Sequence, residues 1–212
     1  NLIANVEAEL AKADVLAKSS LKKDDAAQAD EAGIKKLLDL GVKDSKRMSD
    51  KTVLELAKKI KTTVPHTIVR LLPKKYNELY ASFHNLNRLL AWGHATAITE
   101  LVEKTGCREV LIDQFASEPL VENALKKKNI ETHLTQRPRA EEDPVVAAAS
   151  ILARGAFLDG LELLSQQVGT PLPKGASDKV IAAAKLLVRQ KGKEILGDVA
   201  KLHFKTTDEV LL

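Results

Sequence analysis

Two aspartates in this 212-residue chain stand where rigid elements are expected to end or begin. Asp113 closes the apolar run 110–112, and Asp143 directly precedes Pro144 and an alanine-rich apolar segment. A carboxylate at the end of a buried strand is costly unless it is paired or bound to a cation. Carboxylate oxygens on fixed elements suit a hard cation such as Mg²⁺. Asp113 and Asp143 are therefore the candidate metal ligands.

Each of these carboxylates also has a purely structural interpretation. Asp143 falls at the N-cap of the expected helix, with Pro144 at the first helical position. Asp113 could cap the turn that follows its strand. Glu141 and Glu142 stand beside Asp143 and could share its role. From the residues alone, both interpretations remain open.

A polar loop carries a second set of candidate site residues. Lys43, Ser45 and Lys46 lie in the segment KDSK, which follows Gly41. Ammonium groups and a hydroxyl can bind phosphate oxygens through charge and hydrogen bonds. The alternative is an ordinary solvated loop.

The spacing of apolar residues predicts the elements that must position these groups. We expect helices over 1–23, about 30–41, 50–61, a short stretch after Pro73, 85–104, 116–128, 144–168 and from Ser177, and strands over 66–72, 109–115 and 130–135. Strands that alternate with helices indicate an α/β fold with a mixed sheet. In such folds, sites lie beyond the carboxyl ends of strands, which is where Asp113 is expected.

Composition narrows the class of protein. The net charge of +4 and the pI near 9 are compatible with a polyanionic partner, although a mildly basic surface needs no special role. Cys107 is the only cysteine, so a disulfide framework is excluded. No apolar run of about 18 residues and no signal-peptide pattern is evident, so we expect a cytoplasmic protein without a membrane span. Nucleotide-binding glycine loops and zinc motifs are absent from the sequence.

Seven motifs occur in an order that resembles a known family. They are LGVKDSK (40–46), YNELY (76–80), NLNRLLAWGHA (85–95), VLIDQF (110–115), RPRAEEDPVVAAASILAR (137–154), LPKGAS (172–177) and LHFKTT (202–207). The chain resembles the bacterial type 2 ribonucleases H over about residues 30–210, and the ribonuclease HIII branch fits best.

The resemblance implies a ribonuclease H-like mixed sheet flanked by helices. It further implies endonucleolytic cleavage of the RNA strand of RNA–DNA hybrids by two-metal-ion hydrolysis with Mg²⁺ or Mn²⁺. Asp113 matches the third of the family's four acidic residues, and Asp143 best matches the fourth. Lys43, Ser45 and Lys46 match the family's substrate-facing loop. We expect the protein to be a monomer that binds the RNA–DNA hybrid. We do not expect it to bind a membrane.

The chain departs from the family pattern at one place. The family's first two acids form an Asp–Glu pair in a glycine-rich strand segment, and only Asp30 and Glu31 offer similar letters. We interpret these two residues as the start of a helix that leads into the KDSK loop. The expected organisation is an N-terminal helix and linker over 1–29 and a ribonuclease H-like core over 30–212 without the family's first strands. A hybrid-binding module without cleavage is therefore the alternative function, and a helical interaction protein is a weaker one.

Overall fold

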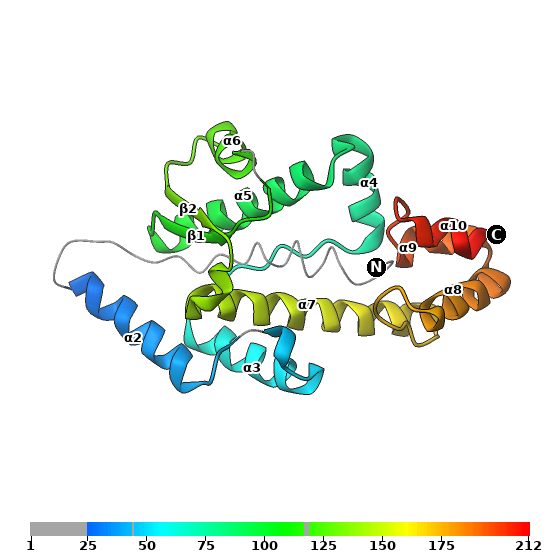
Figure 1. Cartoon of the computed structure of the whole chain (residues 1–212), viewed down its shortest axis with the longest axis horizontal. Coiled ribbons are helices and arrows are strands. Elements are labelled where there is room, and N and C mark those ends of the chain that lie inside the picture. The colour runs from blue at the N-terminus through cyan, green and yellow to red at the C-terminus, as the bar shows by residue number, and fades with distance from the viewer. Residues whose placement is uncertain (1–24, 44, 117–118) are drawn as a thin grey trace.

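Helix α7 (Pro144–Val168) runs through the middle of the molecule, and the other elements lie on both sides of it and beyond its end (Figure 1). The computed structural model describes residues 25–43, 45–116 and 119–212, with side chains from Ala32 onward. The helices are α2 (Asp25–Asp39), α3 (Asp50–Thr63), α4 (Pro73–Phe83), α5 (Leu86–Thr105), α6 (Leu120–Lys127), α8 (Asp178–Lys191), α9 (Leu196–Val199) and α10 (Lys205–Leu211). The strands are β1 (Glu109–Asp113) and β2 (His133–Arg137), and the 3₁₀ turns are η2 (Ser45–Arg47), η3 (Ala140–Glu142) and η4 (Lys193–Ile195).

Helix α7 is apolar because it is the core helix. It is 25 residues long, and by length and composition alone it could cross a membrane. However, 61% of its apolar window is buried inside the protein. Its first half joins one core cluster with Val53, Leu56 and Ile60 of α3, and its second half joins another with Val180 and Leu187 of α8. We therefore interpret α7 as a helix that the rest of the fold covers.

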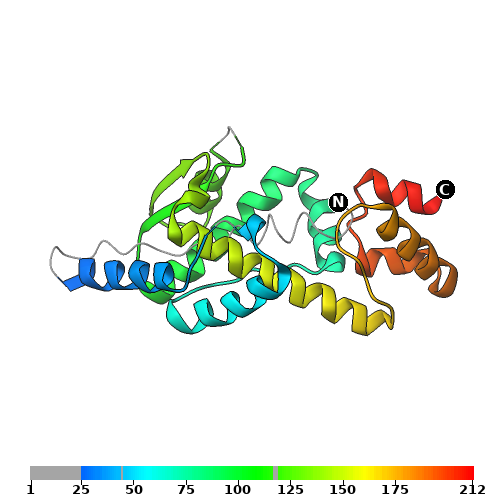
Figure 2. The same cartoon turned by 60° about the horizontal axis from the view of Figure 1, so that its bottom comes forward.

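Helices α3 and α7 approach each other closely, and both views place them side by side (Figure 2). A Cβ atom built on Gly155 of α7 would lie 2.8 Å from the Cβ of Ala57 in α3. Real Cβ atoms essentially never approach so closely, so glycine is required at position 155 for this packing. This contact brings the middle of α3 close against α7.

The sheet consists of two parallel strands in the part of the chain that the structure describes. Strand β1 pairs with β2 in a register that places Glu109 opposite His133 and Asp113 opposite Arg137. Helices α5 and α6 share a core cluster with β1, in which Val110 and Ile112 are buried. Because the strands are parallel, both carboxyl ends lie at the same edge, and the turn after β2 comes next to Asp113.

Most expected elements are confirmed, with shifted ends. Helices α3, α5 and α7 agree with their predictions within about two residues, and Ser49 caps α3 as expected. Helix α2 begins at Asp25, earlier than predicted, and it contains Asp30 and Glu31. The helix predicted over 1–23 lies outside the described residues.

One predicted strand is wrong. Residues 66–72 carry no regular secondary structure and take no place in the sheet. The β-branched composition of this segment favours an extended backbone, but a strand also needs a partner. The last predicted strand is displaced, since β2 covers His133–Arg137 rather than 130–135. The α/β class is confirmed, and the sheet of the described residues is a single parallel pair.

Candidate functional site

Asp113 ends β1 and contacts the turn that precedes α7. Its side chain is half-buried, and its Oδ1 accepts a hydrogen bond from the backbone N–H of Ala140 at 3.1 Å. Ala140 begins the 3₁₀ turn η3, three residues after the end of β2. The parallel register therefore places a residue of one strand end beside a turn that lies 27 positions later in the chain.

Asp143 follows the same turn and caps α7. Its Oδ1 accepts a hydrogen bond from the backbone N–H of Val145 at 3.0 Å, as the N-cap interpretation predicted. Asp113 and Asp143 thus flank η3 from its two ends. Capping and metal binding are compatible, because a carboxylate oxygen has more than one lone pair to offer.

Glu141 and Glu142 face different surroundings, a difference that the sequence did not distinguish. The Glu141 Oε2 atom is buried and has no hydrogen-bond partner among the described residues, while its Oε1 lies 3.8 Å from the Nζ of Lys46. The Glu142 side chain is exposed and lies 3.3 Å from the Nε of Arg139. A buried carboxylate oxygen without a partner is costly, so Glu141 is the better candidate for binding a cation.

The KDSK loop meets α7 through Ser45. The Ser45 side chain is buried, and its Oγ lies 2.6 Å from the Oγ of Ser150 in α7. Lys43 and Lys46 remain exposed on the surface. Of the three residues predicted to face a substrate, Lys43 and Lys46 are therefore on the surface. Ser45 is not, because its hydroxyl already has a partner inside the protein.

A cluster of charged groups holds the same loop to α7. Arg154 donates hydrogen bonds to the backbone carbonyl of Ser45 and to Asp50 Oδ1, the latter at 2.6 Å. Lys174 donates to the other carboxylate oxygen of Asp50. The hydrogen bond from Lys174 and then that from Arg154 lower the pKa of Asp50, although partial burial opposes them.

This charged cluster was not predicted from the sequence. Ser150 and Arg154 lie seven and eleven residues after Asp143, a spacing that places all three on one side of a helix. That spacing was the signal available in the sequence. The partner residues, Ser45 and Asp50, lie more than 100 positions away in the chain, so only the fold identifies them.

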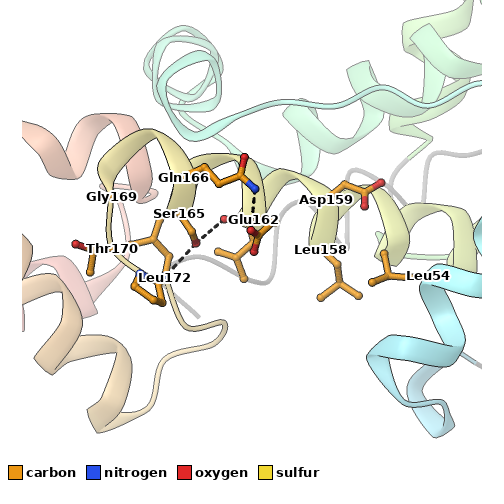
Figure 3. A pocket seen from close by; sticks show the side chains of 11 residues that line it. Leu54, Leu158, Asp159, Glu162, Ser165, Gln166, Gly169, Thr170 and Leu172 are labelled. Carbon is orange, nitrogen blue, oxygen red and sulfur yellow. Dashed lines mark hydrogen bonds between the residues drawn. The ribbon is translucent and has the colours of Figure 1, made fainter.

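The described residues contain no group of three His, Cys, Asp or Glu side chains that could hold a metal ion. A pocket of about 620 Å³ lies elsewhere, between Leu54 of α3 and the second half of α7 (Figure 3). Its charged lining residues are Asp159 and Glu162, so its charge opposes a polyanion. Asp159 is 16 residues beyond Asp143, or about 24 Å along the helix. This pocket is therefore separate from the carboxylates around η3.

Comparison with known proteins identifies the family. The sequence model of ribonuclease HII matches residues 26–207. The chain belongs to the ribonuclease HII family. The family match covers every candidate site residue named above.

Curated members of the HIII branch are similar in sequence. The chain is 54% identical over 176 residues to ribonuclease HIII of Protochlamydia amoebophila, covering 83% of the chain and 58% of that protein. It is 48% identical over 183 residues to ribonuclease HIII of Chlamydia felis, covering 85% of the chain and 61% of that protein. The chain thus spans about 60% of the length of these relatives.

Solved structures agree with the sequence comparison. Bst-RNase HIII in complex with Mn²⁺ superposes with a TM-score of 0.80 at 36% identity, covering 86% of this chain and 61% of that one. RNase H3 of Aquifex aeolicus gives a TM-score of 0.65 at 31% identity, covering 81% of this chain and 62% of that one. The predicted resemblance to the ribonuclease HIII branch is therefore confirmed.

Proposed function

We propose that this protein is a metal-dependent endonuclease that cleaves the RNA strand of RNA–DNA hybrids. The observation that carries the proposal is that Asp113 and Asp143, the acids matched to the family pattern, flank the turn η3 of a ribonuclease HII-family chain. The Bst-RNase HIII relative is a Mn²⁺ complex, which supports a divalent cation as the cofactor. Mg²⁺ and Mn²⁺ both prefer oxygen ligands of this kind.

The residues around η3 fit a divalent cation in part. Asp113 and Asp143 are the proposed ligands. The same turn carries Glu141, whose buried Oε2 has no hydrogen-bond partner among the described residues. Mg²⁺ often binds one or two protein carboxylates and takes its other ligands from water and substrate phosphate. We propose the two-metal form of this chemistry. Bound cations stabilise negative charge on the attacking and leaving oxygens of a phosphodiester.

The basic residues of the KDSK loop are proposed to position the substrate. The side chains of Lys43 and Lys46 are exposed, and their ammonium groups would contact the phosphate backbone. Lys46 lies 3.8 Å from Glu141, so the loop that would contact phosphate is adjacent to a carboxylate that would be close to the cation. Ser45 has a positioning role, because its buried hydroxyl forms a hydrogen bond that holds the loop against α7.

The test is cleavage of an RNA–DNA duplex by the wild-type chain and by Asp113→Asn, with Mg²⁺, with Mn²⁺ and with a chelator. We expect cleavage to require the cation and to fall by at least about 100-fold in the variant, since even residues that only support metal ligands are worth about 10–100-fold. Asp159→Asn is the matched control, because Asp159 is an exposed aspartate on α7 distant from η3. Cleavage that survives Asp113→Asn would contradict the proposal. Salt-sensitive binding without cleavage would favour the hybrid-binding alternative.

We also propose that the protein works as a cytoplasmic monomer. The single cysteine is compatible with a reducing compartment, and all of the proposed site residues come from one chain. Light scattering of the protein with and without a hybrid measures its mass. A measured mass of two chains, with activity lost when the two chains dissociate, would contradict the monomer.

A further inference from the structure

A pocket of about 740 Å³ lies between helix α6 and the α4–α5 corner, and none of its lining residues belongs to the turn η3. Its volume is within the usual range of about 300–1,000 Å³ for small-molecule sites. The residues that give the pocket its chemistry are two aromatic, one amide and three basic side chains, namely Phe83, Trp92, Asn123, Arg88, Lys127 and Lys128. Neither the family motifs nor the proposed cleavage assigns a role to this pocket.

The aromatic side of the pocket consists of two rings that pack against the hydrophobic core. The rings of Phe83 and Trp92 lie 6.4 Å apart between centroids and are inclined by 48°. Both rings are half-buried, and they pack against the core cluster of Leu71, Tyr76, Leu89 and Leu90. A ring that is held by core residues on one side and faces a pocket on the other can stack on a flat ring. Such stacking costs the held ring little further conformational entropy.

Among the described residues, no acidic side chain lines the basic side of the pocket. Arg88, Lys127 and Lys128 are exposed, and none of them forms a salt bridge with a described residue. The described residues that line this pocket include no Asp or Glu, and Glu122 of α6 lines a different hollow. A helix end commonly carries lysines because they complement its dipole. Here two of those lysines face the same pocket as Arg88 and a tryptophan.

We propose that this pocket binds single-stranded nucleic acid. One base stacks on Trp92, and the neighbouring phosphates contact Arg88, Lys127 and Lys128. Sites of this kind combine an aromatic platform with basic side chains that follow the backbone. A phosphate-bearing chain of flat bases fits both halves of the pocket, whereas an acidic peptide would use only the basic half.

This binding goes beyond the proposed cleavage and does not depend on it. Helix α6 shares its core cluster with β1, through Val121 and Ile112. The pocket wall and the strand that carries Asp113 therefore share one hydrophobic core cluster. A single-stranded segment that extends from a hybrid could be held at the pocket while the duplex lies at η3.

Trp92 is the only tryptophan in the chain, so its fluorescence reports on this pocket directly. The experiment titrates the full chain with a 12-nucleotide oligothymidylate and follows both tryptophan emission and the anisotropy of a labelled oligonucleotide. We expect saturable quenching that weakens with salt. The pair Arg88→Gln and Lys127→Gln should raise the Kd at least about tenfold, because two phosphate contacts are lost. The matched control, Arg189→Gln with Lys193→Gln, removes two exposed charges from another surface and should leave the Kd unchanged.

Two further measurements make the result decisive. Trp92→Leu should weaken binding and Trp92→Phe should restore most of it, with circular dichroism to show that each variant is folded. Asp113→Asn should bind the oligonucleotide as the wild type does, so a failure of the cleavage proposal is distinguishable from a failure of this one. Binding that leaves Trp92 emission unchanged, a Kd unaffected by the paired substitution, or equal affinity for poly-glutamate would overturn the proposal.

Discussion

The hydroxyl oxygens of Ser45 and Ser150 lie 2.6 Å apart, although 105 positions separate the two residues in the chain. Ser45 belongs to the loop proposed to contact phosphate, and Ser150 belongs to the helix that begins at Asp143. Arg154 strengthens the same connection, one turn further along α7, through the Ser45 carbonyl and Asp50. The loop proposed to contact phosphate and the turn with the carboxylates are therefore both held by α7.

A double-mutant cycle tests this connection. We expect Ser45→Ala and Ser150→Ala each to reduce the free energy of unfolding by about 1–2 kcal/mol, because each leaves a hydroxyl in a partly or fully buried place without its partner. The double variant should lose less than the sum of the two, by about 0.5–1 kcal/mol. Urea unfolding measures all three values. Thr62→Ala, which changes an exposed hydroxyl, should remain within about 0.5 kcal/mol of the wild type, and strictly additive serine values would contradict the connection.

Glu141 and Glu142 should differ in their effect on the cation. Glu141→Gln should raise the Mn²⁺ concentration for half-maximal cleavage by about tenfold or more, because it removes a charged oxygen from the buried side of η3. Glu142→Gln should change it little, since that side chain is exposed and lies beside Arg139. Neither change should lower thermal stability appreciably. Equal effects of the two substitutions on the Mn²⁺ requirement would show that burial does not select the ligand.

His203 should make stability depend on pH in the mildly acidic range. Burial, and then the positive charge of Lys201, lower the pKa of His203 below its usual 6.5. The folded state thus binds the proton less well than the unfolded state. The stabilising contribution is complete above the unfolded pKa near 6.5 and is lost as the pH falls through the lower folded pKa.

The measurement is the free energy of unfolding of the wild type and of His203→Asn at pH 7.5 and at pH 5.5. The variant should lose less stability between the two values, whatever its stability at pH 7.5. His84→Asn is the control, because His84 is exposed and has a left-handed backbone that asparagine tolerates. A pH dependence identical in wild type and His203→Asn would exclude His203 as its source.

The contact between α3 and α7 predicts a large effect for a single methyl group. Gly155→Ala places a Cβ 2.8 Å from that of Ala57, so the two helices must move apart. We expect a loss of about 1–3 kcal/mol from overpacking. Gly197→Ala meets nothing within 4 Å and should be neutral or slightly stabilising. Adding Ala57→Gly to Gly155→Ala should recover part of the loss, and a stable Gly155→Ala protein would mean that the helices are not in such close contact.

The sequence predicted the features that depend on neighbouring residues. Pro144 and Asp143 specify the start of α7 locally, and the apolar run before Asp113 specifies β1 locally. Both structural placements of the candidate ligands were therefore predictable. Their metal-binding roles stay predictions, as do those of Lys43 and Lys46.

The features that the sequence did not predict depend on distant partners. Residues 66–72 have strand-like composition but no strand partner, and β2 is displaced because pairing with β1 sets its ends. The interior position of Ser45 depends on Ser150, and the distinction between Glu141 and Glu142 depends on which way a three-residue turn faces. Composition and residue spacing do not specify these long-range contacts.

Helix α7 supplies residues to two separate core clusters, one with α3 and one with α8. Neither cluster can come apart without exposing one half of a single continuous helix. The two ends of the molecule should therefore lose structure together rather than one after the other, and the amide protons at the centre of α7 should be among the last to exchange with solvent. The helix that presents Asp143 at its start thus also makes unfolding cooperative along its whole length.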